Sequence, residues 1–438
     1  MMPNDTIYAL SSGGLPSGVA VIRMSGPQAE SVAISISGAL PSPRVMGRRT
    51  IRTRNGNVLD EALVVVFPAP ASFTGETCVE LHLHGGRATV AAVLDLFSSY
   101  TGLRHAEAGE FTRRALANGK MDLAQAEGLG DLLEAETEAQ RRLAQDLTSG
   151  HLSVLYRGWA ERILHARAMI EAELDFADEE DVPGSVSERI WADVAEIADA
   201  MGRHLDRSAV AAIARDGLRV VIHGPPNAGK SSLINSLSGD SIAIVTDVAG
   251  TTRDILTTDL VLNGFAIRLF DTAGIQETQD VVEAEGIRRA ELAVESADVI
   301  LSLSDSSTFL PLPDNCIGQL IRVRTKIDVL PLAEGECYDV AISVVSGTGM
   351  DRLRAIIGAC LPDLAAFQTA ATPARRRHAE GLKLAHDELT YALKSEDLSL
   401  ELRSEHLRRA ATGIGRITGQ TNVDDLLDVI FTSFCIGK

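Results

Sequence analysis

The chain has 438 residues, enough for two or three domains, and its 4% aromatic content favours helices over an all-β architecture. With a formal net charge of -19 its surface as a whole repels nucleic acid, so any RNA contact requires a local basic patch. There is no apolar run of membrane-spanning length and no signal-peptide pattern, and the five scattered cysteines suggest reduced thiols, so we expect a cytoplasmic protein.

Residues 1–120 are expected to form a mixed α/β domain. Apolar runs separated by turn residues predict three strands, at Gly18–Arg23, Ala62–Phe67 and Cys78–His84. Helical patterns predict two helices, at Ala88–Ser99 and Glu107–Asn118, the second ended by Gly119.

Long helical patterns flank a second α/β region. Leucines recur at three- and four-residue spacing within residues 121–215, and helical patterns return over residues 371–438. Residues 216–370 alternate strand and helix signals, as a doubly wound, mostly parallel sheet does. Because the termini of a domain often lie close together, we expect this α/β domain to be inserted into one helical domain built from both flanks.

A phosphate-binding loop is predicted at residues 224–231, which read Gly-Pro-Pro-Asn-Ala-Gly-Lys-Ser. A strand candidate precedes the loop and a helix candidate follows it, as the motif requires. In such a loop backbone N–H groups surround the phosphates, Lys230 reaches the β- and γ-phosphates, and the Ser231 hydroxyl binds Mg²⁺. The loop residues expected to contact the nucleotide are Asn227, Ala228, Gly229, Lys230, Ser231 and Ser232.

Three further segments indicate which nucleotide is bound. Asp271 ends a strand candidate, as a Walker-B carboxylate does, and the residues after it can reach the γ-phosphate. Asp328 can accept two hydrogen bonds that guanine donates and adenine does not. A third segment stands where a last base-contacting loop belongs, and the order of the three favours GTP over ATP. The residues assigned to the nucleotide here are Asp271, Thr272, Ala273, Gly274, Lys326, Asp328, Ser343 and Val344.

The catalytic groups of this site depart from the ordinary small GTPases. Those enzymes place a water-orienting glutamine where this chain has Ile275, so another water-orienting group and another positive charge are needed. Oxygen atoms of residues 246–254, together with the Asn227 side chain, can cage a monovalent cation beside the phosphates. Glu283 is able to orient water, although its place at a helix start equally suits a residue that complements the helix dipole.

Motifs in the α/β core and at both ends of the chain point to one family. The core motifs are residues 224–231, 246–254 and 271–275. The others are Ser72–Glu76, His84–Gly86, Gly109–Ala115, Lys120–Glu127 and Cys435–Lys438. With this combination the chain resembles, over essentially its whole length, the MnmE (TrmE) tRNA-modification GTPases.

The resemblance implies an α/β folate-binding and dimerising domain at residues 1–120, a helical domain at 121–215 and 371–438, and an inserted P-loop G domain at 216–370. It implies a homodimer whose G domains pair during GTP hydrolysis, with potassium and Mg²⁺ as cofactors. The implied partner is the flavoprotein MnmG, in a heterotetramer or larger complex. Together they would modify the wobble uridine of certain tRNAs at C5, with a carboxymethylaminomethyl-type product, using a one-carbon unit from 5-formyltetrahydrofolate or a related tetrahydrofolate.

Family roles carry over to matching positions. The resemblance implies potassium ligands Asn227, Thr246, Val248 and Thr251, magnesium ligands Ser231 and Thr252, and folate contacts Arg23, Glu76 and Lys120. Thr246 and Thr252 are expected to contact the nucleotide as well. Glu283 matches the family's water-orienting glutamate, so it joins Lys230 as a catalytic candidate. Cys435, in the C-terminal motif, is a possible functional thiol.

Two positions depart from the family pattern. Thr325 stands where the guanine-reading segment usually has Asn, and Val344 stands where Ala is more usual. We therefore expect one base contact and the GTP affinity to be weaker, while Asp328 keeps the guanine-specific pair of hydrogen bonds.

Other polar groups have an ordinary structural explanation beside the functional one. His82 and His84 alternate onto one strand face as a metal half-site would, but no further ligand follows at a recognisable spacing. Three arginine clusters are candidates for tRNA phosphate contacts, and a solvated basic face explains them equally well. The clusters are Arg44, Arg48, Arg49, Arg52 and Arg54; Arg375, Arg376 and Arg377; and Arg408 and Arg409.

Two other GTPase classes match parts of the sequence. A ribosome-assembly GTPase shares the G-domain motifs but should end in a KH-type RNA-binding module, and no Gly-x-x-Gly loop follows Pro373. A dynamin-like GTPase needs a lipid-binding segment, and neither a basic amphipathic stretch nor an apolar tip is evident. Neither class explains the first 120 residues.

Overall fold

The computed structural model describes residues 5–175, 185–239, 257–271, 292–313, 315–332, 335–363, 372–395, 399–419 and 437. The chain divides into two compact units. The first contains Met1–Gly130, Thr148–Glu161 and Ala411–Lys438, and the second contains Asp131–Leu147 and Arg162–Ala410. Within the described ranges no helix is both long enough and apolar enough to span a bilayer. The predicted domain boundaries, after residues 120, 215 and 370, remain predictions.

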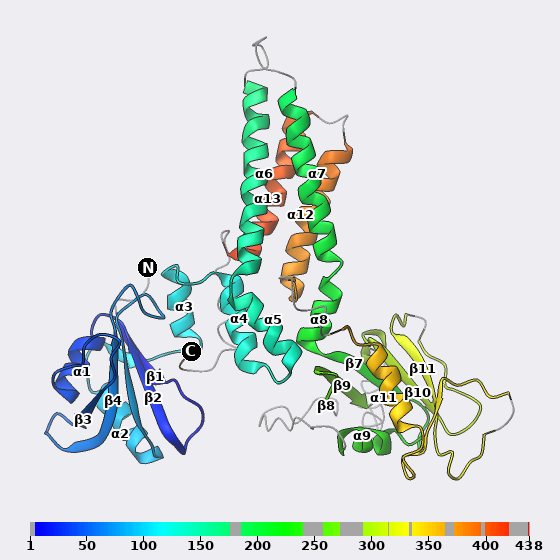
Figure 1. Cartoon of the computed structure of the whole chain (residues 1–438), viewed down its shortest axis with the longest axis horizontal. Helices are drawn as coiled ribbons and strands as arrows, with labels where there is room; N and C mark the ends of the chain where they lie inside the picture. The colour runs from blue at the N-terminus through cyan, green and yellow to red at the C-terminus, as the bar shows by residue number, and fades with distance from the viewer. Residues whose placement is uncertain are drawn as a thin grey trace, which may run out of the picture. The chain divides into compact units, whose positions relative to one another are not determined.

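The first unit is built on a six-stranded sheet (Figure 1). Its strands are β1 (Thr6–Leu10), β2 (Ser17–Ser25), β3 (Gly47–Arg52), β4 (Val58–Phe67), β5 (Cys78–Gly85) and β6 (Leu103–His105). Their order is β3-β4-β5-β2-β1-β6, with β1 and β6 parallel and the other pairs antiparallel. The three predicted strands are confirmed as β2, β4 and β5. The strands β1, β3 and β6 are additional to that prediction.

Helices α1 (Ala29–Ser37) and α2 (Arg87–Ser98) cover one face of this sheet and share its buried apolar core. The predicted helix at Ala88–Ser99 is therefore confirmed as α2. Helix α3 (Glu110–Ala117) begins three residues later than the predicted Glu107. Gly109 has a left-handed φ of +66°, and the Glu110 carboxylate accepts a hydrogen bond from the Glu107 N–H, so a turn precedes the helix.

Helices follow, as predicted for residues 121–215 and 371–438. They are α4 (Leu123–Glu134), α5 (Glu138–Thr148), α6 (His151–Asp175), α7 (Ser185–Leu205), α8 (Ser208–Asp216), α12 (Arg376–Lys394) and α13 (Leu400–Thr418). Within the second unit α7 packs along α12, and its buried residues recur at three- and four-residue spacing, namely Ile190, Val194, Ile197 and Met201. Arg403 of α13 lies over the Trp191 ring of α7, 3.5 Å from its centroid, which ties α13 to the same bundle.

The second unit also contains a six-stranded sheet flanked by α9 (Lys230–Gly239) and α11 (Met350–Ala359) (Figure 1). Its strands are β7 (Leu218–His223), β8 (Thr257–Leu262), β9 (Phe265–Asp271), β10 (Val299–Ser304), β11 (Gln319–Arg324) and β12 (Val340–Ala341). The order is β12-β11-β10-β7-β9-β8, and every pair is parallel except β8 with β9. The predicted doubly wound, mostly parallel sheet is confirmed.

His204 in α7 gives the second unit a specific pH dependence. Its side chain is 7% exposed, and burial, aided by the charge of Arg207, lowers its pKa to about 4. In an unfolded chain the pKa of a histidine is about 6.5, so as pH falls the unfolded state takes up the proton before the folded state does. Neutral His204 therefore contributes all of its stabilisation above pH 6.5, and this contribution to the free energy of unfolding is lost as pH falls toward 4. The loss reaches about 3 kcal/mol at most.

Denaturant unfolding of the full chain, followed by far-UV circular dichroism between about pH 7 and pH 4.5, measures this dependence. His204→Gln removes the titrating group and should flatten the curve of unfolding free energy against pH. His165→Gln, which removes an exposed histidine of α6, should keep the wild-type slope. Equal slopes for the two variants would contradict the role given to His204.

Candidate nucleotide-binding site

The sheet of the second unit brings the predicted nucleotide residues together at the carboxyl ends of its parallel strands. Strand β7 lies between β9 and β10, and β11 lies beyond β10, all four parallel. Their carboxyl ends therefore meet, and ligands of open α/β sheets bind at such ends. The phosphate loop follows β7, Asp271 ends β9, and Thr325 follows β11.

The backbone of the loop leaves little choice of residue at its start. Gly224 has a φ of +155°, and a Cβ there would lie 2.4 Å from the Leu303 carbonyl oxygen of β10. Asn227 and Gly229 also have positive φ, +65° and +92°. Asparagine tolerates this left-handed conformation better than most residues do. Asn227 is exposed at the surface of the loop, where its side-chain oxygen can meet a ligand.

Lys230 begins α9 and is 7% exposed. Its Nζ donates hydrogen bonds to the carbonyl oxygens of Gly224 at 2.7 Å and Pro225 at 2.9 Å, so the ammonium lies across its own loop. Burial lowers the pKa of Lys230, and the Asp271 carboxylate opposes that shift. A phosphate oxygen in place of a carbonyl adds the attraction between opposite full charges, which is stronger at a buried site than in water. The buried ammonium is therefore poised to bind an anion.

Two oxygen-bearing side chains stand beside this lysine. The Ser231 hydroxyl donates to Asp271 Oδ2 at 3.2 Å, and Asp271 is buried at the end of β9. Hydroxyl and carboxylate oxygens are the hard donors that Mg²⁺ prefers, and Mg²⁺ usually completes its shell with water and phosphate oxygens. The chemistry of this donor pair therefore fits Mg²⁺. In the described part of the chain no group of three or more His, Cys, Asp or Glu residues could hold a metal ion alone.

Thr325 ties the predicted base-reading segment to the phosphate loop. Its side chain is buried, and the hydroxyl donates to the Ala228 carbonyl oxygen at 2.8 Å. Its backbone N–H donates to the Ser304 carbonyl oxygen at the end of β10, also at 2.8 Å. The threonine that departs from the family pattern thus links two parts of the site. The sequence carries no signal for this contact.

The predicted guanine-reading residues lie beside the last base-contacting segment. The Ile327 N–H donates to the Ile342 carbonyl oxygen at 3.4 Å, which joins the two loops. Lys326 has a φ of +57° and forms an ion pair with Asp305 at 3.0 Å. Asp328 is exposed, so its carboxylate is available to a base. In the second loop Ser343 is buried, and Val344 packs against the core of the sheet.

Several predicted site residues lie outside the described residues. They are Thr246, Val248, Thr251, Thr252, Thr272, Ala273, Gly274, Glu283 and Cys435, and Ile275 lies there too. The potassium cage, the second magnesium ligand, the water-orienting glutamate and the functional thiol remain predictions.

The candidate folate contacts gather around one loop of the first unit. The Arg23 guanidinium lies 5.3 Å from the centroid of the Phe73 ring and donates to Glu80 at 2.9 Å. The side chain of Lys120 lies against Gly75, where an added Cβ would be 3.4 Å from Lys120 Cγ. The third candidate, Glu76, comes next in the same loop.

A buried arginine, Arg114, holds the Glu76 carboxylate in place. Arg114 is fully buried and donates to Glu76 at 3.1 Å, to Glu110 at 3.0 Å and to Asp5 at 2.7 Å. Burial alone would lower the pKa of Arg114, but these three carboxylates outweigh it and raise the pKa. Ser25 also donates to Glu76, at 2.6 Å. A buried guanidinium paired in this way holds the loop that carries Glu76.

Within the first unit, Gly437 of the C-terminal motif lies against the end of β1. The Ser11 hydroxyl donates to the Gly437 carbonyl oxygen at 2.8 Å. A Cβ at Gly437 would lie 2.1 Å from the Leu10 carbonyl oxygen, and the residue has a φ of +102°. Only glycine fits this close approach at the end of β1.

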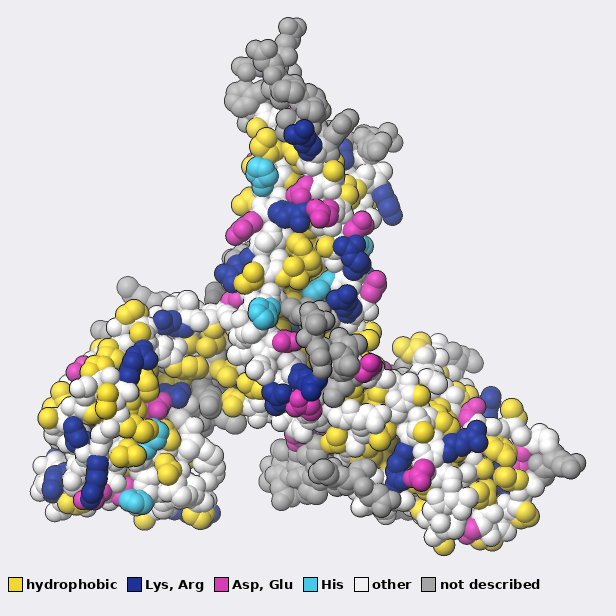
Figure 2. Space-filling model, in the orientation of Figure 1, with side chains coloured by type: hydrophobic (Ala, Val, Ile, Leu, Met, Phe, Trp, Pro, Cys, Tyr) yellow, Lys and Arg dark blue, Asp and Glu magenta, His cyan; other side chains and the backbone are white. Residues whose placement is uncertain are grey.

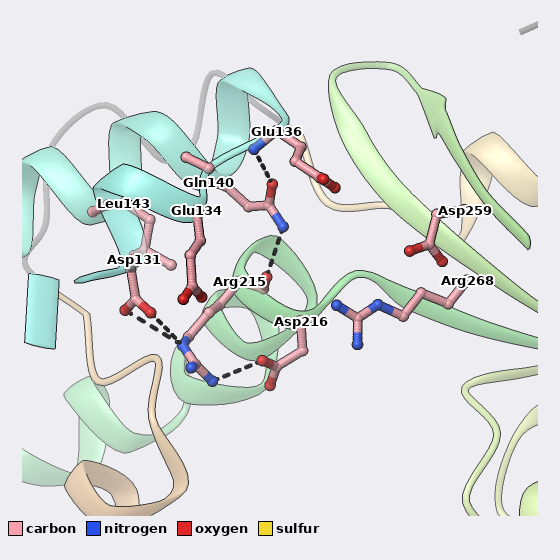
Figure 3. A pocket seen from close by; sticks show the side chains of 11 residues that line it. Asp131, Glu134, Glu136, Gln140, Leu143, Arg215, Asp216, Asp259 and Arg268 are labelled. Atoms are coloured by element: carbon pink, nitrogen blue, oxygen red, sulfur yellow. Dashed lines mark hydrogen bonds and ion pairs between the residues drawn. The ribbon is translucent and has the colours of Figure 1, made fainter. Parts of the chain in front are cut away.

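A separate cavity of about 320 Å³ in the second unit was not predicted from the sequence (Figure 3). Five carboxylates and two guanidinium groups are among the residues that line it, from α4, α5, α8, β8 and β9 and their connections. On its wall Gln140 Nε2 donates to the Arg215 carbonyl oxygen at 3.0 Å, and Arg215 pairs with Asp131 and Asp216. This excess of negative charge disfavours phosphate, so we place the nucleotide at the loop after β7.

The Thr325 contact leads to a measurable prediction. Thr325→Val keeps the shape of the side chain but removes the hydroxyl, so the Ala228 carbonyl oxygen loses its donor. We expect the dissociation constant for GTP to rise about tenfold, which corresponds to about 1.4 kcal/mol. Thr325→Ser, which keeps the hydroxyl, should bind GTP nearly as the wild type does. Equal affinities for the valine and serine variants would contradict this role.

Family comparisons agree with the motifs in both units. The family described as "MnmE helical domain" matches residues 123–435, and that described as "GTP-binding protein TrmE N-terminus" matches residues 6–120. The tRNA modification GTPases MnmE of Sinorhizobium medicae and Rhizobium meliloti are each 54% identical to this chain, over 100% of both sequences. The solved FeoB G domain of Methanococcus jannaschii matches 32% of this chain and 95% of its own at 19% identity, with a TM-score of 0.24. The predicted family is confirmed, and the chain belongs to the MnmE family of tRNA modification GTPases, which are P-loop GTP-hydrolysing enzymes.

Proposed function

We propose that this protein hydrolyses GTP in a potassium-dependent manner and couples hydrolysis to modification of the wobble uridine of certain tRNAs at C5. The observation that carries the proposal is the nucleotide site, in which a phosphate loop, Lys230 and the Ser231–Asp271 pair meet at one sheet edge. The relatives are tRNA modification GTPases, which supports the choice of tRNA as the substrate class.

Each described side chain of the site has a separate task in hydrolysis. Lys230 exchanges its two carbonyl partners for phosphate oxygens and holds the β- and γ-phosphates. Ser231 and Asp271, which lie within hydrogen-bond distance of each other, would hold Mg²⁺, directly or through water. When bound, Mg²⁺ neutralises charge on the phosphate oxygens. Asp328 selects guanine by accepting its two neighbouring N–H groups.

Ile275 cannot replace the water-orienting glutamine, and the transition state needs a positive charge beside the phosphates. We assign the first task to Glu283 and the second to a potassium ion held by Asn227, Thr246, Val248 and Thr251. A monovalent cation beside the phosphates stabilises the charge that develops in the transition state. Asn227 suits this role because it is exposed on the phosphate loop.

The three kinds of domain have separate roles in the proposed assembly. We assign folate binding and homodimer formation to residues 1–120, a helical domain to residues 121–215 and 371–438, and pairing G domains to residues 216–370. The partner is the flavoprotein MnmG, in a heterotetramer or larger complex in the cytoplasm. The one-carbon unit comes from 5-formyltetrahydrofolate or a related tetrahydrofolate near Arg23, Glu76 and Lys120, and the product is of the carboxymethylaminomethyl type. Cys435 remains a candidate functional thiol.

Potassium dependence is tested by GTP hydrolysis in KCl and in NaCl at equal ionic strength. We expect faster hydrolysis in KCl for the wild type. Asn227→Gly keeps the left-handed backbone but removes the side-chain oxygen, so it should abolish the difference between the two salts. Asn263→Gly is the matched control, because Asn263 also has a positive φ, +52°, but lies in the turn between β8 and β9.

Equal rates in the two salts for the wild-type protein would overturn the proposed cation. Loss of the potassium effect in both asparagine variants would show that backbone change rather than a ligand is responsible, and would remove Asn227 from the proposed cage.

A further inference from the structure

The edge strand of the first sheet carries an unusually basic run. Five arginines, at positions 44, 48, 49, 52 and 54, fall on β3 and its flanks, and no Asp or Glu occurs between residues 43 and 59. Strand β3 is the outermost strand of its sheet and pairs with β4 only, within the described residues. Figure 2 shows Lys and Arg side chains gathered over the part of the first unit where Figure 1 labels β3. We call these five residues the arginine edge.

The arginine edge is held mainly by neutral partners. Arg48 pairs with Glu61, and in the described part of the chain the other four guanidinium groups form no ion pair with a carboxylate. These four donate to backbone carbonyl oxygens: Arg44 to Ala71, Arg49 to Ala39 and Arg48, Arg52 to Gly56, and Arg54 to Ser99. Because each guanidinium has five N–H donors, these bonds set its position and leave further donors for an outside anion.

Arginines of the other two clusters form ion pairs with carboxylates. Arg408 and Arg409 both pair with Glu405, at 2.7 and 3.2 Å. Arg376 pairs with Glu380 at 2.6 Å, and Arg375 pairs with Asp131 at 2.7 Å. An arginine already paired with a carboxylate must give up that partner before it can bind a phosphate. Of the three clusters, only the arginine edge offers several positive charges without a carboxylate partner.

The composition and spacing of the arginine edge suit a phosphate backbone. All five cations are arginines, whose planar fork binds phosphate through two parallel hydrogen bonds. Arg48 and Arg52 lie four residues apart, about 13 Å along the strand, which is room for more than one phosphate. The Arg54 guanidinium lies 4.1 Å from the centroid of the Tyr100 ring. Aromatic rings and arginine planes are both groups on which unpaired RNA bases stack.

We propose that the arginine edge binds the ribose-phosphate backbone of the tRNA substrate. This inference rests on the proposed function, in which tRNA is the substrate class, and adds where on the chain the RNA lies. The contacts position the RNA without reading its sequence, because they address phosphates rather than base edges. In a chain with a formal net charge of -19, such a local patch is what an RNA contact requires.

The test measures tRNA binding by the full-length protein over a series of salt concentrations, by fluorescence anisotropy of a labelled tRNA transcript. The test variant is Arg52→Gln/Arg54→Gln, and the matched control is Arg408→Gln/Arg409→Gln. Both remove two exposed arginines, but the control pair is bonded to Glu405. In the test variant the slope of log K against log salt concentration should fall in magnitude by about 1.4 to 1.8, for two lost phosphate contacts. The control should keep the wild-type slope.

GTP hydrolysis by each variant provides an independent measure of integrity, since neither pair belongs to the nucleotide site. If the wild type binds tRNA and both variants bind it with the wild-type slope, the inference fails while the proposed function stands. If the wild type does not bind tRNA, the proposed tRNA function fails and the inference with it. Binding of phosphatidylserine vesicles that the test variant loses while its tRNA binding is unchanged would assign the arginine edge to a membrane instead, and would also overturn the inference.

Discussion

The parallel pairing of β7 with β9 and β10 is the constraint on which the site depends. In this register Ile222 lies opposite Asp271, and His223 lies opposite Ser302, so the start of the phosphate loop is fixed between two strand ends. The loop then passes so close to Leu303 that Gly224 has no room for a side chain. Lysine, serine and aspartate converge because a buried sheet places them there. The chemistry of phosphate binding is therefore a consequence of strand order.

In the first unit, a buried charge holds together separate segments of the chain. Arg114 is fully buried, which is costly unless its charge is paired and its donors are satisfied. Asp5, Glu76 and Glu110 supply that pairing from three separate segments, and thereby hold the loop around which the folate candidates gather. The arginine edge is the opposite case, because carbonyl oxygens position four of its five cations without cancelling their charge. The same residue type thus serves structure in one place and is available to a ligand in another.

What could be predicted from the sequence depended on whether the signal was local. Gly224 and Lys230 belong to a contiguous motif whose backbone shape has one common use, and β7 and α9 flank it as predicted. The Thr325–Ala228 bond joins residues 97 positions apart, and no spacing rule reveals it. The predicted start of α3 is wrong because a helix pattern continues through residues 107–109, whereas the left-handed Gly109 and the Glu110 carboxylate decide where the helix begins. Likewise, only the fold shows which arginine clusters are already paired.

A direct measurement of the central claim, that this sheet edge is a guanine nucleotide site, compares the binding of GTP, ATP and xanthosine triphosphate by the wild type and by Asp328→Asn. Guanine donates two neighbouring N–H groups to a carboxylate, whereas xanthine presents a carbonyl oxygen in place of the amino group and accepts from an amide. If Asp328 reads the base, the wild type prefers GTP. The Asn variant then loses at least about tenfold in GTP affinity and gains affinity for xanthosine triphosphate. Unchanged GTP affinity in the Asn variant, or equal binding of GTP and ATP by the wild type, would contradict a guanine site built in this way.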